Sequence, residues 1–373
     1  MGFAIGAAMV AMVPSLAISR SLADVALREL APGVGYTNEV VPRGPWSIHV
    51  VRVARDLPGV ELASVHADGA ATGLATLTEM VESVHANVGA PLAALNGDFY
   101  QRDRLFAGDP RGLQVVNGEV LSVPHARGGV ALWIDAEGLP HVGNVEPALR
   151  VRWPDGSAAT FGLNEERALD DMVLYTGSMK VPLRNMGGRE WVLVSTNSNA
   201  GRPVASPGGV QSMRVHETRA SGGGKVPADA WVLSAGPMWL RKNPGVSNVV
   251  AGSVVLMELG TVPGLAGVRQ AIGGGPVLVS GGRPQRIAPS GSGSYEFSSM
   301  TQRHPRSAFG WNRTHWLLFQ VDGRQPELSV GMTLEELGAT MVRWGCLEGM
   351  NLDRKSTRLN SSHEWISRMP SSA

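Results

Sequence analysis

Glycine and proline interrupt this chain so often that long helices have little room in it. The sequence contains 47 glycines and 24 prolines among its 373 residues. Between them lie short apolar or alternating runs, such as 46–65, where a Pro-Gly turn separates two strand-like halves. Because glycine and proline form turns and end helices, the pattern predicts many short strands joined by tight turns.

Two segments carry the signature of a helix start. Thr76 precedes Glu79 by three residues, and Thr333 precedes Glu336 by three, so each pair forms a capping box before an apolar run. After the second box, apolar side chains recur at helical spacing until Gly345, a residue type that commonly ends helices. We expect helices at both places, with strands outnumbering helices overall.

No repeat and no proline- or serine-rich linker divides the chain. Residues 24–353 are therefore expected to form a single catalytic-type domain of the α+β class, with strand-rich mixed sheets and a few helices. A net charge of +1 requires no basic face, so nucleic acid is not an expected partner. The one cysteine, Cys346, allows no intrachain disulfide, and its apolar neighbours favour a packed residue over a nucleophile.

The first residues resemble an export signal. An apolar run from Phe3 to Ile18 is followed by a small-x-small pattern at 21–23, although no Lys or Arg precedes the run. We expect 1–23 to be a signal peptide and the protein to be periplasmic or extracellular. An uncleaved anchor or a misassigned start codon is the alternative, but Pro14 and the shortness of the run argue against a membrane span.

The last residues do not read as part of the domain. Residues 354–373 show no apolar period, and the stretch from Asp353 to His363 is the in-frame translation of a common sequencing-library adapter. We expect this tail to be a disordered sequencing artefact that replaces the natural C-terminus, which makes the chain a fragment. A natural polar tail is the alternative.

Polar clusters follow several apolar strands, and strand ends can hold side chains rigidly while leaving them accessible. Asn96 and Asp98 flank a glycine and could face a ligand together or form a simple Asx turn. Asp109 and Arg111 lie between two glycines, where an exposed ion pair is the alternative.

Glycines 273–275 could bring backbone N–H groups close to an anion, or form only a tight turn. No GK[ST] follows them and the next element is a strand, so neither a P-loop nor a dinucleotide site is predicted. Arg306 and Arg324 lie on either side of the apolar run that ends before Asp322, and arginine binds phosphate through its planar fork. Solvated charge is the alternative for both arginines.

Metal and cofactor chemistry have no motif in this sequence. The histidines show neither HExxH nor HxH spacing, and a lone cysteine cannot form CxxC, so no metal site and no cofactor are predicted. No G-x-S-x-G elbow marks a nucleophilic serine.

Several of these motifs together resemble the phosphodiester glycosidase family, which includes bacterial proteins of the exopolysaccharide-biosynthesis type. They occur in one order over 35–352: NGDFY, GDPRGLQVVNGEVLS, FGLNEER with VLYTG, AIGGGPVLV, RHPRSAFGWN, and VDGRQPELS running into the last helix. The resemblance implies a hydrolase that releases a sugar from a sugar-1-phosphodiester on a cell-surface or extracellular glycan.

The resemblance also assigns residues to the site. The matching positions are Asn96, Asp98, Gly274, Gly275, Arg306, Asp322, Arg324, Asn351 and Asp353. The family continues Asn-Leu-Asp with Gly-Gly-Gly-Ser-Thr, whereas Asp353 is followed here by Arg354 and Lys355. If the missing loop completes the cavity, the chain as written is expected to be weak or inactive.

The mechanistic hypothesis follows from the leaving group. A phosphate leaves as an acidic group and needs little protonation, so arginines can stabilise its charge instead. Arg306 and Arg324 are expected to bind it together with the glycine N–H groups, and Arg111 and Asn351 to bind other parts of the substrate. Three carboxylates could activate water or attack the sugar: Asp98, Asp322 and Asp353.

One geometric condition applies to this hypothesis. It requires Arg306, Asp322 and the turn at 273–275 to share one hollow. The competing interpretation is a non-catalytic glycan-binding or exopolysaccharide-assembly protein that uses the same cavity.

Overall fold

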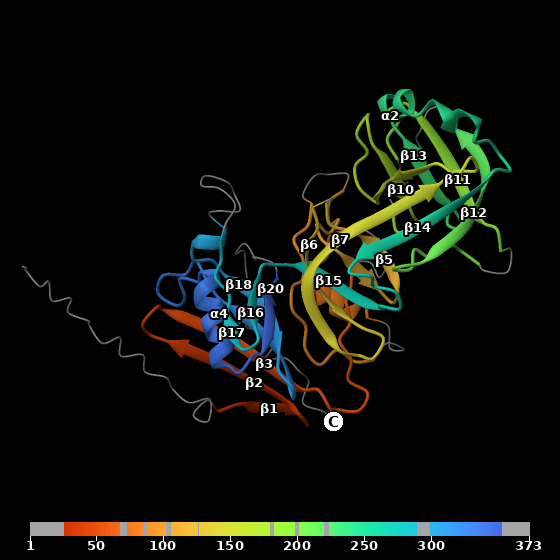
Figure 1. The fold of residues 1–373 in the computed structure, drawn as a ribbon. Helices are drawn as coiled ribbons and strands as arrows, with labels where there is room; N and C mark the ends of the chain where they lie inside the picture. The colour runs from red at the N-terminus through yellow and green to blue at the C-terminus, as the bar shows by residue number, and fades with distance from the viewer. Residues whose placement is uncertain are drawn as a thin grey trace, which may run out of the picture.

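The computed structural model describes residues 26–67, 73–84, 89–101, 106–125, 127–179, 183–197, 201–219, 224–288 and 299–352. The predicted signal peptide at 1–23 and the tail at 354–373 lie outside these ranges. The strand-rich prediction is confirmed, because two large sheets dominate the fold and helices are few and short (Figure 1).

The first sheet joins the two ends of the described chain. Its eight strands run in the order β1-β2-β3-β19-β18-β20-β16-β17, and every pairing is antiparallel. The N-terminal strands meet the C-terminal ones through β3 and β19. The strands are β1 (Arg28–Ala31), β2 (Val34–Val41), β3 (Trp46–Ala54), β16 (Val277–Ser280), β17 (Arg283–Pro284), β18 (Arg306–Trp311), β19 (His315–Val321) and β20 (Glu348–Asn351).

Only the first half of the predicted strand pair at 46–65 is a strand. It forms β3, whose partners are β2 and β19. The segment after the turn lies outside the named strands, and its apolar residues Leu57, Val60 and Leu62 pack against the sheet. Its alternating pattern therefore reflects packing on a sheet face rather than membership of the sheet.

Helix α4 (Leu334–Arg343) covers one face of the eight-stranded sheet. Both halves of the predicted capping box form: Glu336 N donates to Thr333 Oγ1 at 3.1 Å, and Thr333 N donates to Glu336 Oε2 at 2.9 Å. Gly345, at φ +82°, follows the helix as predicted. Cys346 is buried in the same core, and burial raises the pKa of its thiol to about 12, as befits a packed residue. The first capping box likewise begins helix α1 (Leu77–Glu82).

The second sheet has a twelve-stranded layout that extends into a distal half of the molecule (Figure 1). The 13-residue strand β7 spans it, pairing with β6 at one end and β14 at the other. Its strands are β4 (Gln114–Val116), β5 (Glu119–Ser122), β6 (Gly129–Ile134), β7 (Pro140–Arg152), β8 (Ala158–Thr160), β9 (Gly162–Leu163), β10 (Met172–Tyr175), β11 (Arg189–Ser195), β12 (Val210–Arg219), β13 (Trp231–Ala235), β14 (Val254–Val262) and β15 (Gln270–Gly274). Two short helices, α2 (Pro237–Lys242) and a 3-10 helix at Pro244–Asn248, follow β13.

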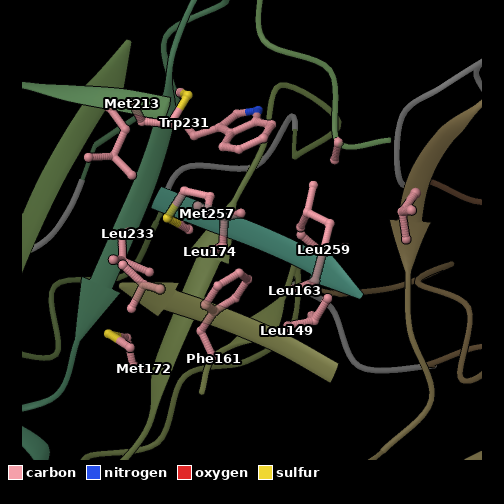
Figure 2. Close-up of a cluster of buried hydrophobic side chains, with 14 of the residues drawn as sticks. Leu149, Phe161, Leu163, Met172, Leu174, Met213, Trp231, Leu233, Met257 and Leu259 are labelled. Atoms are coloured by element: carbon pink, nitrogen blue, oxygen red, sulfur yellow. The ribbon is translucent and has the colours of Figure 1, made fainter. Parts of the chain in front are cut away.

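The distal half has its own hydrophobic core. Figure 2 shows side chains of β7, β9, β10, β12, β13 and β14 directed toward one another. Trp191 is fully buried there, packs on Trp153 with ring centroids 5.2 Å apart, and donates from Nε1 to Val249 O at 3.0 Å. The long pairing of β7 with β14 therefore has an apolar layer of its own beneath it.

The two sheets meet where β15 leads into β16. Only Gly275 and Pro276 separate the strands, so the chain crosses from one sheet to the other within two residues. Beside this crossover, Phe309 and Met350 of the eight-stranded sheet share a core with Leu132 of β6. The face of the eight-stranded sheet opposite α4 is thus covered by the twelve-stranded sheet. Along the described chain, no helix combines the length and apolarity needed to cross a membrane.

The distal core predicts a clear contrast between two leucines. Replacing the fully buried Leu233 by alanine removes its packing and leaves a cavity, so we expect the free energy of unfolding to fall by roughly 2–5 kcal/mol. Leu256→Ala, at a position 40% exposed on β14, is the control, with an expected change within about 0.5 kcal/mol. Urea denaturation of both variants measures the difference, and equal losses would contradict the assignment of this core.

Candidate functional site

Asp98 lies beside the crossover and is bound by two backbone N–H groups. Phe99 N donates to its Oδ1 at 2.7 Å, and Gly112 N donates to its Oδ2 at 2.6 Å. Backbone donors orient a carboxylate firmly because charge-assisted hydrogen bonds are short and strong. The Asn96–Asp98 turn is thereby connected to the chain that enters β4.

Two glycines make this approach of the carboxylate possible. A Cβ at Gly273 would lie 2.4 Å from Asp98 Oδ2, and one at Gly112 would lie 2.6 Å from the same oxygen. Real Cβ atoms do not come that close, so any other residue type would displace the carboxylate. The first glycine of the triple is therefore in direct contact with Asp98.

The other two glycines of the triple contact the C-terminal strand. Gly275 N donates to Asn351 O at 2.7 Å, and Asn351 Nδ2 donates to Gly275 O at 2.9 Å. Gly274 pairs with Val130 in the sheet, and a Cβ on it would lie 2.7 Å from Asn351 O. The expected anion nest does not match this arrangement, because the Gly275 N–H is already donated to protein.

The phosphate-binding role expected of Arg306 does not match its position. The side chain is 2% exposed, and its guanidinium donates to Met332 O at 3.0 Å, Ser299 O at 2.6 Å and Gln302 O at 3.0 Å. Its register partner, Val321, belongs to the core beneath α4. Arg306 therefore holds the segment before β18 against the residues that lead into α4.

Asp322 lies on the opposite face of the sheet. Ser47 Oγ donates to its Oδ2 at 2.9 Å, and His49 Nε2 lies 3.1 Å from the same oxygen. The residue is 7% exposed, and its backbone N–H donates to Ser47 O at 3.0 Å. Because Arg306 is on the helix-covered face, the single hollow expected for Arg306, Asp322 and the glycine turn is not formed.

His49 links Asp322 to a tyrosine nearer the surface. Tyr36 Oη lies 2.8 Å from His49 Nδ1, and the two rings stack 8° from parallel. We assign the ring proton to Nε2, where the carboxylate accepts it, so that Nδ1 accepts from the Tyr36 hydroxyl. Burial raises the pKa of Tyr36, which keeps the phenol protonated as this chain of hydrogen bonds requires.

Ser47, His49 and Asp322 do not form a nucleophilic triad. Ser47 Oγ and Asp322 Oδ2 both approach the same ring nitrogen, Nε2, at 3.4 and 3.1 Å. A triad needs the serine and the acid on opposite nitrogens of the imidazole. Here the serine and histidine instead position the carboxylate of Asp322.

The remaining predicted residues are more open or lie outside the described ranges. Arg111 is exposed, and its Nη2 lies 3.4 Å from Gln101 Oε1. Arg324 is exposed just after Asp322, with a left-handed backbone at φ +59°. Asn96 is half-buried and follows Leu95, which packs between the sheets. Asp353 lies outside the described residues.

Direct contacts connect the surroundings of Asp98 to those of Asp322. The glycine triple that touches Asp98 also touches Asn351, and Leu352 N, one residue on, donates to Ser307 O at 2.8 Å. Ser307 Oγ donates to Gln320 Oε1 at 2.8 Å, and Gln320 is the register partner of His49. We call this continuous row, from Asp98 through the glycines, Leu352, Ser307 and Gln320 to His49 and Asp322, the crossover band.

The polar side chains of the crossover band are carboxylates, an amide, a hydroxyl and the imidazole of His49. Within the described ranges, no three His, Cys, Asp or Glu side chains lie close enough together to hold a metal ion. Two carboxylates positioned by hydrogen bonds can act as a base, a nucleophile or an acceptor for sugar hydroxyls. The arrangement suits acid–base work on an oxygen-rich substrate.

The sequence analysis missed His49 of the crossover band, together with Ser47, which contacts Asp322, and Tyr36, which contacts His49. A signal for the first two exists in the alternation of 46–54, where Ser47 and His49 share a face opposite the apolar Ile48 and Val50. A histidine in such a strand is usually a core residue, and only the register with β19 shows that it faces a carboxylate.

Because Gly273 lies against Asp98, adding one methyl group at this position is predicted to destabilise the protein. Gly273→Ala places a Cβ against the carboxylate, and we expect it to lower the free energy of unfolding by about 1–3 kcal/mol. Gly264→Ala is the matched control, because nothing lies within 4 Å of its Cβ position. Thermal and urea unfolding measure both variants, and a Gly273→Ala protein as stable as the control would show that the close contact is absent.

Comparisons with known proteins support the resemblance. Residues 204–354 match the family described as phosphodiester glycosidase. This stretch includes Asp322, the glycine triple and Asn351, but not Asp98. No curated protein matches the chain.

Two solved structures share the fold. A hypothetical protein from Synechocystis superposes with a TM-score of 0.66 at 19% identity, over 87% of this chain and 56% of that one. A Burkholderia pseudomallei K96243 protein whose description suggests export gives 0.60 at 23% identity, over 83% of this chain and 68% of that one. The catalytic domain of zebrafish N-acetylglucosamine-1-phosphodiester α-N-acetylglucosaminidase, auto-inhibited by its pro-peptide, gives only 0.21 at 13% identity, over 70% of this chain and 83% of that one. The chain thus spans little more than half of the Synechocystis protein.

Proposed function

We propose that this chain, whose residues 204–354 carry the phosphodiester glycosidase match, is a hydrolase that cleaves the bond between a sugar and its phosphate in a sugar-1-phosphodiester. The observation that carries the proposal is the crossover band, in which a row of successive contacts through intervening residues connects two oriented carboxylates, Asp98 and Asp322. The apolar run at the N-terminus favours action outside the cytoplasm, on a cell-surface or extracellular glycan.

The two carboxylates have different surroundings, which suits a division of labour. Asp98 accepts from backbone N–H groups at 2.6 and 2.7 Å, whereas Asp322 contacts the side chains of Ser47 and His49. One of them activates water or attacks the anomeric carbon, and the other accepts hydrogen bonds from the sugar. His49 is a positioning residue, because it acts through Asp322.

We propose that the exposed Arg111 and Arg324, rather than the buried Arg306, bind the phosphate. Arg324 lies two residues beyond Asp322. Arg111 immediately precedes Gly112, whose N–H binds Asp98. Both guanidinium groups are accessible, unlike that of Arg306. A phosphate leaves as a stabilised anion, so cations at this end of the substrate can replace a protonating acid.

One sequence observation favours a second function. Where the family has Gly-Gly-Gly-Ser-Thr after Asn-Leu-Asp, this chain has Arg354, Lys355 and Ser356. If that loop completes the catalytic cavity, the chain as written would bind a glycan phosphodiester without hydrolysing it. The same behaviour with the loop restored would identify a glycan-binding or exopolysaccharide-assembly protein.

Substitution of the two carboxylates tests the proposed function. Asp98→Asn and Asp322→Asn keep the shape of each side chain but remove its charge, and we expect each to lower kcat by about 10²-fold or more. The measurement, made on protein whose C-terminal Gly-Gly-Gly-Ser-Thr loop has been restored, is release of free sugar from the phenyl phosphodiester of α-N-acetylglucosamine 1-phosphate. Asp155→Asn, at an exposed turn in the distal half, is the control with unchanged rate.

Two results contradict hydrolysis at this site. Full activity in both variants would remove the carboxylates from the mechanism. Binding of the phosphodiester without any turnover, by the protein with its C-terminal loop restored, would favour the glycan-binding function instead.

A further inference from the structure

The phenol of Tyr36 is joined to Asp322 through the imidazole of His49. Tyr36 precedes Asn38 by two residues on β2, and Asn38 is the register partner of His49 on β3, so the tyrosine and the histidine share one sheet face. Tyr36 Oη lies 2.8 Å from His49 Nδ1, and His49 Nε2 lies 3.1 Å from Asp322 Oδ2. Three adjacent strands, β2, β3 and β19, thereby supply one continuous row of polar side chains.

Packing alone does not require the hydroxyl of this tyrosine. The ring of Tyr36 packs against the apolar cluster on its sheet face and stacks 8° from parallel with His49. The guanidinium carbon of Arg28 lies 5.7 Å from the ring centroid. A phenylalanine ring could make all three contacts. Among the described residues, the Tyr36 hydroxyl hydrogen-bonds only to His49 Nδ1, so its influence on the site passes through the imidazole.

The two nitrogens of the His49 ring have opposite roles. Nε2 faces a carboxylate oxygen of Asp322, which only accepts hydrogen bonds while it is ionised, so this nitrogen carries the ring proton. A neutral imidazole has a single N–H, which leaves Nδ1 as the acceptor for the Tyr36 hydroxyl. In the other tautomer, the lone pair of Nε2 would face the carboxylate and the contact would become repulsive.

The carboxylate of Asp322 has a second donor in Ser47. The Ser47 hydroxyl has one proton, and its Oγ lies 2.9 Å from Asp322 Oδ2 but 3.3 Å from Asn38 Oδ1, so we assign the proton to the shorter contact. His49 Nε2 approaches the same carboxylate oxygen. Two donors on one oxygen fix the rotation of the carboxylate only while Nε2 keeps its proton and its direction. The orientation of Asp322 therefore depends on the state of His49.

We propose that Tyr36 is a positioning residue for Asp322: its hydroxyl donates to Nδ1 and thereby holds the imidazole of His49 neutral, with Nε2–H directed at the carboxylate. The effect on rate rests on the proposed function, in which Asp322 reacts with the sugar or binds it. The hydrogen-bond arrangement itself does not depend on hydrolysis, so it can be measured separately.

NMR tests the arrangement directly. Long-range ¹H–¹⁵N spectra of protein labelled with ¹⁵N-histidine report which ring nitrogens are protonated, and the His49 signals are those that His49→Gln removes. We expect a protonated Nε2 and an unprotonated Nδ1 in the wild-type protein. Tyr36→Phe leaves the buried Nδ1 without this donor, so the ring gains a proton there or turns, and we expect both His49 signals to move. His141 is the internal control, because its Nε2 lies 2.6 Å from Asp135 Oδ2 in the other sheet, and its signals should not change.

Hydrolysis gives the second measurement, made on the protein with its C-terminal loop restored. We expect Tyr36→Phe to lower kcat about tenfold and to change KM by less than about twofold, because one hydrogen bond that orients the carboxylate indirectly is lost. Tyr175→Phe is the matched control with unchanged kcat, since it removes the hydroxyl of a buried tyrosine in the distal half.

Three results overturn the proposal. The first is a wild-type His49 that carries its proton on Nδ1 or on both nitrogens, and the second is a Tyr36→Phe protein with unchanged His49 signals. The third is a Tyr36→Phe protein whose His49 signals move while kcat stays at the wild-type value. Should Tyr36→Phe fail to fold, the tautomer of the wild-type ring decides.

Failure of the proposed function has a different outcome. It would appear as absence of hydrolysis in every variant, the wild-type sequence with its restored loop included. The NMR comparison of wild type with Tyr36→Phe would then decide by itself whether Tyr36 holds the imidazole toward Asp322.

Discussion

The reciprocal hydrogen bonding of Gly275 with Asn351 fixes the geometry on which the rest of the structure depends. It ties the crossover between the sheets to the last described strand through two hydrogen bonds. Gly275 N–H donates to Asn351 O at 2.7 Å, and the side-chain amide of Asn351 donates to Gly275 O at 2.9 Å. Asn351 is buried, so these partners replace water that it cannot reach. If this connection opened, the glycines against Asp98 and the strand beside Ser307 would no longer be held in one register.

The crossover also explains why carboxylates can be placed there at all. On either side of it the sheets bury apolar faces, with Phe309 and Met350 in one core and the distal tryptophans in another. Segments packed beside such a junction keep their side chains rigid but still supply backbone N–H groups, and Asp98 accepts from those of Phe99 and Gly112. On the face covered by α4, Arg306 holds the segment before β18 in place through hydrogen bonds to backbone carbonyls. Its role is therefore structural, although its sequence motif suggested phosphate binding.

Local patterns in the sequence predicted the local features well. The capping box at Thr333 and the Gly345 stop are determined by neighbouring residues, so they were predictable, as was the Asn117-Gly118 turn between β4 and β5, where both residues take positive φ. The contacts that build the crossover band are not local. His49 and Asp322 are 273 positions apart, and only the pairing of β3 with β19 brings them together. The face on which Arg306 lies depends on that same register, because a shift of one residue exchanges the two faces of a strand.

The central claim is that Asp98 and Asp322, which a row of contacts across the crossover connects, serve one reaction. A double-mutant cycle on kcat/KM with Asp98→Asn, Asp322→Asn and the double variant tests it most directly. Residues that act on the same transition state are strongly non-additive, so the double variant is predicted to be little slower than the slower single variant. Effects that multiply without coupling would contradict the account, because the two carboxylates would then act independently.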